Sequence, residues 1–357
     1  MPITIAVMLA SILQSLDTTI ANVALPHIGG SLSATLEETE WVLTSYIVAS
    51  AIMTPLSGWF AGRVGRKKVL ALSAAGFTIS SAMCGMAQSL TQIVLFRTLQ
   101  GICGAALVPL SQAVLLDINP VEHHGRAMAV WGMGVLIGPI IGPTLGGWLT
   151  DNYSWRWVFY INVPFGILSV LGILTYMRES RRNDKPFDFA GFAMLSLGIG
   201  ALQIMLDRGQ LLDWFTSKEI WIEAVVCGLS FYLFLVHTFT SRHPFVSPAL
   251  FKDRNFAVGT MFIFVIGVVL FATLALLPPL LEDLLGYPVT TTGLVTSPRG
   301  IGAFITTFII GRLVGRVRNR VLLSIGFALL AASSFWLGQI NLEIGMANVL
   351  WPSVLNG

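Results

Sequence analysis

The segment GWFAGRVGRKKVL at Gly58–Leu70 decides the fold of this chain, because a related segment, GRLVGRVRNRVLL, returns at Gly311–Leu323. Each copy is a short basic loop set between two long apolar stretches. A basic loop that recurs in this way is typical of a membrane chain built from duplicated halves, as transporters often are. The first copy follows the second apolar stretch and the other follows the tenth, so we expect two extra spans between halves of six.

The composition excludes a soluble globular protein, since 55% of the 357 residues are hydrophobic, only 11% are charged and mean hydropathy is +0.77. A hydrocarbon layer of about 30 Å is crossed by roughly 20 apolar residues in a helix. Eleven stretches meet this requirement, at residues 3–26, 41–61, 69–88, 92–116, 127–149, 158–177, 187–206, 219–240, 256–281, 289–311 and 321–340. A twelfth begins near Met346 and stops at Gly357, so we expect a C-terminally truncated all-α membrane protein.

The basic residues predict the orientation of these spans. Sixteen of the 21 Lys and Arg residues lie in loops on the side of the N-terminus, and three lie in loops on the opposite side. Lys and Arg accumulate in the cytoplasmic loops of membrane proteins. We therefore expect a cytoplasmic N-terminus in a bacterial inner membrane, and no nucleic-acid partner for the basic loops.

Two polar stretches divide the chain. RESRRNDKP at Arg178–Pro186 follows the sixth span, and SRHPFVSPALFKDRN at Ser241–Asn255 precedes the ninth. They predict a six-span bundle at residues 1–178, a linker with two extra spans at 179–255, and an incomplete C-terminal bundle at 256–357. The two bundles are expected to be pseudo-symmetric halves.

The fifth span carries a stripe of small residues interrupted by prolines. Its glycines recur every four residues and share one helical face: Gly134, Gly138, Gly142 and Gly146, with Pro139 and Pro143 between them. This pattern fits a tight helix crossing, and it also fits a close-packed pivot that seals one side of a pathway. The two interpretations are compatible.

Asp17 and Arg97 are the candidate proton-coupling residues. A carboxylate within a span costs about 2.5–3.5 kcal/mol on insertion scales, so its presence calls for a reason. Counting residues from the span ends places both side chains at similar depth, where they could face each other across a cavity. We hypothesise that Asp17 binds a proton and that Arg97 moves relative to it; the alternatives are a static ion pair and, for Arg97, extension to the interface.

Four further polar residues are candidates for a substrate cavity: Thr18, Asn22, Gln100 and Arg299. The first two either orient Asp17 or merely pack beside it. Gln100 either hydrogen-bonds Arg97 or the substrate, or is an ordinary core amide. Arg299 follows Pro298 near mid-bilayer and either lines the cavity or pairs with carbonyls of a broken helix. One acid and two guanidiniums favour neutral, monocationic or weakly acidic amphipathic substrates over obligate dications.

Several motifs resemble those of the major facilitator superfamily and, within it, the fourteen-span drug:proton antiporters of the EmrB/QacA type. The similar stretches are LDTTIANVALP (Leu16–Pro26), GWFAGRVGRKKVL, RTLQGICGAA (Arg97–Ala106), GVLIGPIIGPTLGGW (Gly134–Trp148), WRWVFYINVPFG (Trp155–Gly166) and LQIMLDRGQLLDWF (Leu202–Phe215). The resemblance implies multidrug efflux, associated with antibiotic resistance, in which amphipathic compounds are exchanged for protons by alternating access. It also implies a periplasmic adaptor and an outer-membrane channel as partners, and no cofactor.

One departure from the family pattern concerns the basic loop. The family often has an acidic residue at the fifth position of this motif, where the chain has Gly62. Gly58, Gly65 and Arg66 remain candidates for gating and packing. Without that acid, we expect the basic side chains to find acceptors such as helix C-terminal carbonyls or lipid phosphates.

Other functional classes lack their motifs. No GxxxxGK[ST] segment is present for ATP hydrolysis, and neither HExxH nor paired acids on one span supply an enzyme or metal site. The chain is therefore not expected to be an enzyme. A channel and an exporter of one endogenous metabolite or siderophore remain alternatives to a drug antiporter.

Overall fold

The structure is a computed structural model. It describes residues 2–179, 186–281, 285–287, 291–292, 295, 298–314, 316–339 and 346–357, and these residues form helices and no named strand. The α-helices within residues 1–118 and 157–247 are α1 Pro2–Leu32, α2 Leu36–Val64, α3 Arg66–Met86, α4 Leu90–Gly104, α5 Leu107–Ile118, α7 Trp157–Tyr160, α8 Asn162–Tyr176, α9 Phe189–Arg208 and α10 Lys218–Thr240. The remainder are α6 His124–Asn152, α11 Arg254–Pro279, α13 Pro298–Leu313, α14 Asn319–Leu337, α15 Ala347–Asn356 and the short turns η1 Val121–His123, η2 Trp214–Thr216 and η3 Pro248–Lys252.

Nine helical segments in the described part of the chain are long and apolar enough to cross a membrane. Their bounds follow the predicted spans closely; the span predicted at 41–61, for example, is the segment Glu37–Val64. The tenth predicted span, 289–311, lies partly outside the described residues, as do residues 180–185 of the predicted linker. The expectation of an all-α membrane bundle is confirmed.

Two predicted spans are broken helices, and proline accounts for both breaks. The span predicted at 92–116 is split between α4 and α5, with Pro109 in the first turn of α5. The span predicted at 158–177 is split at Ile161 between α7 and α8, with Pro164 in the first turn of α8. Proline lacks the N–H that would continue the preceding helix, so each helix restarts just before it. The second break places Asn162 at the first position of α8.

The chain separates into two compact units, one made of residues 1–118 and 137–247 and the other of 119–136 and 248–357. Helix α6 contributes to both units, and the extra helices α9 and α10 belong to the first. The three-part division predicted at 1–178, 179–255 and 256–357 stays a prediction.

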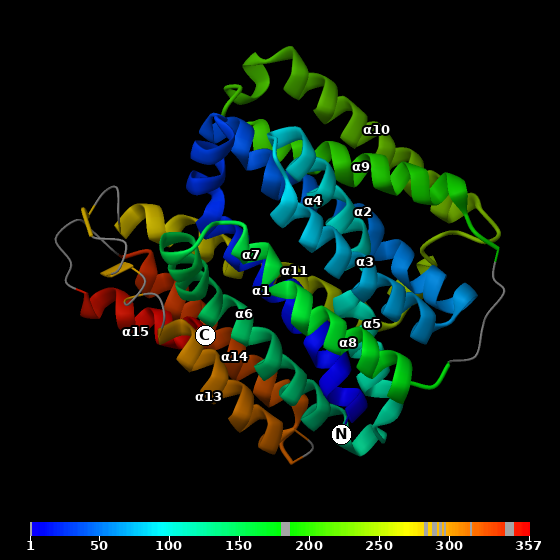
Figure 1. Cartoon of the computed structure of the whole chain (residues 1–357). Helices are drawn as coiled ribbons and strands as arrows, with labels where there is room; N and C mark the ends of the chain where they lie inside the picture. Colours follow the sequence, from blue (N-terminus) through cyan, green and yellow to red (C-terminus); the bar gives the residue numbers. More distant parts are fainter. Residues whose placement is uncertain are drawn as a thin grey trace. The chain divides into compact units, whose positions relative to one another are not determined.

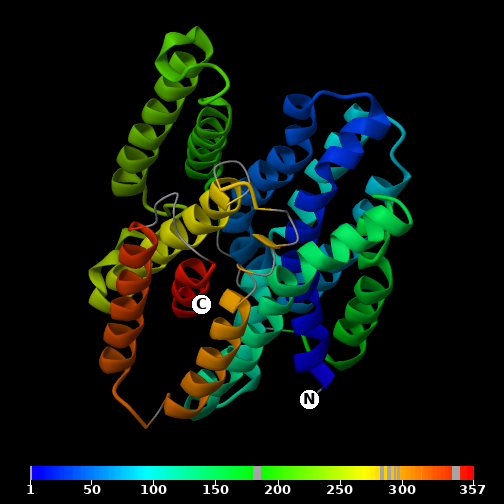
Figure 2. The same ribbon diagram turned by 90° about the vertical axis from the view of Figure 1, so that its left-hand side faces the viewer.

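The first unit contains the two larger buried apolar clusters. One surrounds the first half of α1 with Phe77, Leu107 and Ile173, and the other surrounds its second half with Ile28, Ile93 and Phe159. Figures 1 and 2 show α9 and α10 side by side, and α9 contacts α2. The face that α10 turns away carries large exposed apolar side chains, as expected for a helix in lipid.

The polar end of this helical pair is fixed by Asp188, the N-cap of α9. Its carboxylate accepts hydrogen bonds from the backbone N–H groups of Gly191 (3.0 Å) and Phe245 (2.8 Å), and it lies 2.9 Å from Nε2 of His237 on α10. Burial raises the pKa of this carboxyl, but the hydrogen bonds from Gly191, His237 and Phe245 outweigh it and hold the pKa below its ordinary value.

The second unit has a smaller described core of Leu281, Val295 and Val349. Helix α15 packs against α13 and α14, and the Ser333 hydroxyl of α14 donates to the carbonyl of Pro352 at 2.8 Å. The beginning of α6 approaches α13, where a Cβ on Gly311 would lie 2.9 Å from that of Ala129.

Candidate functional site

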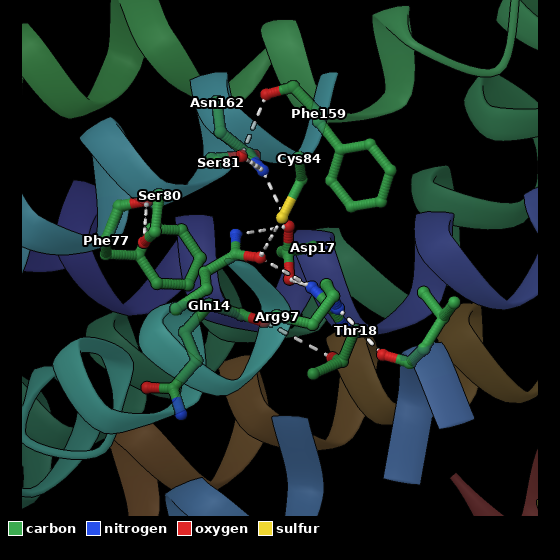
Figure 3. A network of polar contacts seen from close by, with 12 residues as sticks. Gln14, Asp17, Thr18, Phe77, Ser80, Ser81, Cys84, Arg97, Phe159 and Asn162 are labelled. Carbon is green, nitrogen blue, oxygen red and sulfur yellow. Dashed lines mark hydrogen bonds and ion pairs between the residues drawn. The ribbon is translucent and has the colours of Figure 1, made fainter. Parts of the chain in front are cut away.

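Asp17 lies in the interior of the first unit. It sits on α1, where its side chain has no exposed surface, and it points at neighbouring helices, as Figure 3 shows. A buried charge is tolerated only where it is paired and hydrogen-bonded. The neighbours of Asp17 therefore determine what this acid can do.

Arg97 of α4 pairs directly with Asp17. Its Nη1 lies 2.6 Å from Asp17 Oδ2 (Figure 3). The same nitrogen donates to Gln100 Oε1 at 2.8 Å, and the Nε of Arg97 donates to the carbonyl of Val42 at 3.0 Å. The guanidinium lies 4.3 Å from the centroid of the Tyr46 ring. Arg97 is fully buried, so in this structure it does not extend to the interface.

Two carboxamides complete the hydrogen bonding of Asp17. Gln100 Nε2 donates to Asp17 Oδ1 at 2.9 Å, and Asn162 Nδ2 donates to the same oxygen at 2.8 Å. Asn162 Nδ2 also donates to Ser81 Oγ at 3.0 Å, and Ser81 donates to the carbonyl of Phe159 at 2.9 Å. Four helices, α1, α3, α4 and α8, thus meet in one polar network around a single carboxylate.

Asn162 and Ser81 were missed by the sequence analysis. Both stand in apolar stretches, and Asn162 lies within WRWVFYINVPFG. A carboxamide inside a predicted span was the available signal, because an unpaired amide there is costly. Hydroxyls such as that of Ser81 carry a weaker signal, since they often bond their own helix in membranes.

The structure does not bring Thr18 and Asn22 into this network. The Thr18 hydroxyl donates to the carbonyl of Ser15 at 3.0 Å on its own helix. Asn22 is exposed at the surface of the first unit. A role for either residue in a substrate cavity stays a prediction.

Arg299 belongs to the second unit. It is the second residue of α13, directly after Pro298, and it is half-buried. Proline at the first helical position explains why the helix begins here. Its predicted place in a substrate cavity stays a prediction.

Acidic side chains contact the basic loop between α2 and α3. The sequence had predicted helix C-terminal carbonyls or lipid phosphates as the acceptors for this loop. Arg66 forms an ion pair with Asp117 at the end of α5, and Glu179 Oε1 accepts from the backbone N–H of Lys67 at 3.3 Å. A carboxylate at the first turn of α3 is also favoured by the helix dipole. Gly65 joins α2 to α3 with φ +106°, a conformation that favours glycine, and a Cβ there would collide with Glu179.

The glycine stripe of α6 permits a close approach to α1. A Cβ on Gly138 would lie 2.6 Å from the carbonyl carbon of Ser15, and one on Gly146 would lie 3.2 Å from the carbonyl oxygen of Ile20. Gly142 meets Thr19 in the same way, and the Thr19 hydroxyl donates to the Gly138 carbonyl at 3.1 Å. A tight crossing of helices is therefore present.

The remaining members of the stripe are Gly134 and the two prolines. Gly134 is buried in the part of α6 that belongs to the second unit, and Pro139 and Pro143 face outward within a continuous helix. A pivot function for the stripe stays a prediction. Among the described residues, no group of His, Cys, Asp or Glu is arranged to hold a metal ion.

The described helices agree with comparisons to known proteins. The family model of the Major Facilitator Superfamily matches residues 7–355. The chain belongs to the major facilitator superfamily. Membership in the superfamily makes it a multi-pass membrane transporter rather than an enzyme.

Two curated relatives of this superfamily member cover nearly all of the chain. The multidrug export protein EmrB of Escherichia coli (strain K12) is 43% identical over 358 residues, which are 99% of this chain and 70% of that protein. The fatty acid resistance protein FarB of Neisseria gonorrhoeae is 41% identical over 360 residues, with the same coverage. A solved structure of the proton:xylose symporter XylE superposes with a TM-score of 0.68 at 16% identity, covering 99% of this chain and 78% of that one, and shows a shared fold.

Proposed function

We propose that this chain exports amphipathic compounds from the cytoplasm across a bacterial inner membrane in exchange for protons, as a fourteen-span antiporter of the EmrB/QacA type. The observation that carries the proposal is the fully buried pair of Asp17 and Arg97. A paired charge inside a membrane bundle is costly to build and is typically found where transporters move protons. The proposed orientation has the N-terminus in the cytoplasm, and alternating access would operate between two pseudo-symmetric halves.

The coupling step follows from the charges of the network. While Asp17 is ionised, its charge cancels that of Arg97 and three donors satisfy it. When Asp17 takes up a proton, Arg97 keeps its charge, because a guanidinium does not lose its proton in proteins. The buried cation is then uncompensated, which favours an arrangement that exposes Arg97 to water or to a new anion. Protonation would in this way bias the bundle between two states.

The names of two relatives support the proposed substrate class. EmrB is named for multidrug export and FarB for fatty acid resistance. Together they fit the neutral, monocationic or weakly acidic amphipaths expected from the charges of the spans. A periplasmic adaptor and an outer-membrane channel are part of the proposal. Export of one endogenous metabolite or siderophore on the same fold is the alternative to drug efflux.

Inside-out vesicles with an imposed proton gradient test the proposal. Wild-type protein is expected to let candidate amphipaths dissipate the gradient, and Asp17→Asn is expected to abolish this exchange while the protein remains folded in the membrane. Unchanged exchange in Asp17→Asn would remove this acid from the mechanism. Unitary electrical currents through the wild-type protein would instead indicate a channel.

A further inference from the structure

Asn162 occupies a fixed position between two helices and the buried acid. It is fully buried at the first position of α8, directly after the break that follows α7. Both hydrogens of its carboxamide are used, one on Asp17 Oδ1 and one on Ser81 Oγ. Its carbonyl oxygen, Oδ1, is also buried and has no hydrogen-bond partner among the described residues. An orphaned acceptor of this kind calls for an explanation.

The other polar groups that face Asp17 are donors. They are the N–H groups of Arg97 and the amide hydrogens of Gln100 and Asn162. This arrangement satisfies an ionised carboxylate, which only accepts hydrogen bonds. A protonated Asp17 would instead have to donate its own hydrogen, and in the described arrangement no acceptor faces it.

Gln100 and Asn162 each bond Asp17 through the carboxamide nitrogen, so a half-turn of either carboxamide would bring its oxygen to face Asp17 as that acceptor. The two oxygens differ in availability. Gln100 Oε1 already accepts from Arg97 Nη1 at 2.8 Å, so turning Gln100 would break a bond to a buried cation. A half-turn of the Asn162 carboxamide breaks no bond to a cation, because Asn162 Oδ1 has no hydrogen-bond partner among the described residues. The half-turn exchanges one unpaired buried atom for another and leaves an oxygen opposite both Asp17 and Ser81.

We propose that Asn162 is the positioning residue that serves both protonation states of Asp17, donating to the carboxylate and, after a half-turn of its carboxamide, accepting from the carboxylic acid. This inference rests on the proposed function and adds a residue to its coupling site. Through Ser81 and its bond to the Phe159 carbonyl, the half-turn also changes the hydrogen bonds that connect α3 to the α7–α8 break. Asn162 therefore links the proton on α1 to two neighbouring helices.

Other titratable or charged groups face the same network from the helices packed around it. They are Arg97 on α4, the Tyr46 phenol ring on α2, which lies against Arg97, and the Cys84 thiol on α3, whose sulfur lies 3.7 Å from Gln100 Oε1. Helix α8 contributes Asn162 itself. Substitution of Asn162 leaves these three groups in place. A change in the pH dependence of exchange after that substitution is therefore attributed to Asn162.

The first test compares Asn162→Leu with Ser169→Ala in proton-driven exchange measured across a range of pH. Leu keeps the approximate shape of Asn but neither donates nor accepts. Ser169 is the matched control, because it is equally buried on α8 and likewise bonds α1, donating to the Ala6 carbonyl at 2.9 Å. Hydrogen bonds to charged groups are the stronger ones, so losing the donor outweighs losing the acceptor.

We expect Asn162→Leu to move the pH of half-maximal exchange upward by about one unit, a tenfold change in proton affinity. Ser169→Ala is expected to leave that pH unchanged, even if its stability falls. An unshifted profile in Asn162→Leu would overturn the inference. If Asn162→Leu fails to fold, Asn162→Asp keeps a similar volume and places a second acid beside Asp17, and it must also shift the profile upward.

Difference infrared spectroscopy with isotope-labelled asparagine tests the half-turn itself. The wild-type spectrum recorded between high and low pH should contain a side-chain amide change that is absent from both Asn162→Leu and Asp17→Asn. Absence of that change in the wild type would overturn the acceptor role. The role proposed for Asn162 can fail while the proposed antiport stands. The antiport proposal fails only if wild-type exchange is absent or if Asp17→Asn leaves exchange intact.

Discussion

Breaking the pair of Asp17 and Arg97 should lower the free energy of unfolding substantially, with a pH dependence set by which partner is removed. In Asp17→Asn, the guanidinium keeps the Val42 carbonyl (3.0 Å), Gln100 Oε1 (2.8 Å) and the Tyr46 ring (4.3 Å) but loses its counter-charge. Removing one member of a buried ion pair typically costs about 3–5 kcal/mol of unfolding free energy. For a chain of this size that corresponds to a fall in Tm of about 4–7 °C.

The opposite substitution, Arg97→Gln, should cost as much near neutral pH but less in acid. The reason is that Asp17 can take up a proton and become neutral, whereas the guanidinium in Asp17→Asn cannot lose its charge. The double variant removes both charges and should regain much of the loss, giving a coupling energy of about 2–3 kcal/mol.

Thermal unfolding of purified protein in detergent, recorded by tryptophan fluorescence at neutral and acidic pH, measures these differences. Losses that add within about 0.5 kcal/mol in the double variant would refute the reasoning, because independent sites add in this way. Equal pH dependence of the two single variants would refute it as well. The comparison needs no transport substrate.

Three further predictions concern other parts of the first unit. Gly138→Ala should lower the free energy of unfolding by about 2–3 kcal/mol, because its Cβ would lie 2.6 Å from the Ser15 backbone. Gly58→Ala is the control and should be neutral, because a Cβ at that position has no neighbour within 4 Å. Equal effects of the two substitutions in thermal unfolding would contradict the close crossing of α6 and α1. Gly65→Ala should cost about 1–3 kcal/mol because of its φ of +106°, and an unchanged Tm would count against this strain. Asp188→Asn should lower the free energy of unfolding at neutral pH. Because the pKa of Asp188 is depressed in the folded protein, the difference in this free energy between the variant and the wild type should vanish as pH falls through that pKa. A difference in Tm that stays constant across pH would argue against the Asp188 cap.

The sequence predicted the positions of the spans and selected Asp17 and Arg97 as candidates, because both inferences rest on large free energies. Apolar stretches of about 20 residues are required by the hydrocarbon layer, and an acid within one of them requires a partner. Depth counting placed Asp17 and Arg97 at similar depth on opposite sides of a cavity, whereas the structure joins them directly, with neither side chain exposed. Their separation and their shared bonds to Gln100 required the packed structure.

The features that sequence reasoning missed depend on contacts between distant segments. Asn162 and Ser81 look ordinary in an apolar stretch, and only the helix break at Ile161 brings the carboxamide to Asp17. The bond from Lys67 to Glu179 was missed for a related reason, since Glu179 stands in a polar linker far along the chain. Hydrogen bonds of this kind leave no periodic signal in the sequence.

The most direct test of the central role of Asp17 is the number of protons released when a transported amphipath binds to the purified protein. Binding is measured in weakly buffered detergent solution with a pH indicator, at a series of pH values from acidic to neutral. We expect close to one proton released per molecule bound by the wild type and none by Asp17→Asn, with binding itself retained. Equal proton release by both proteins would contradict the account.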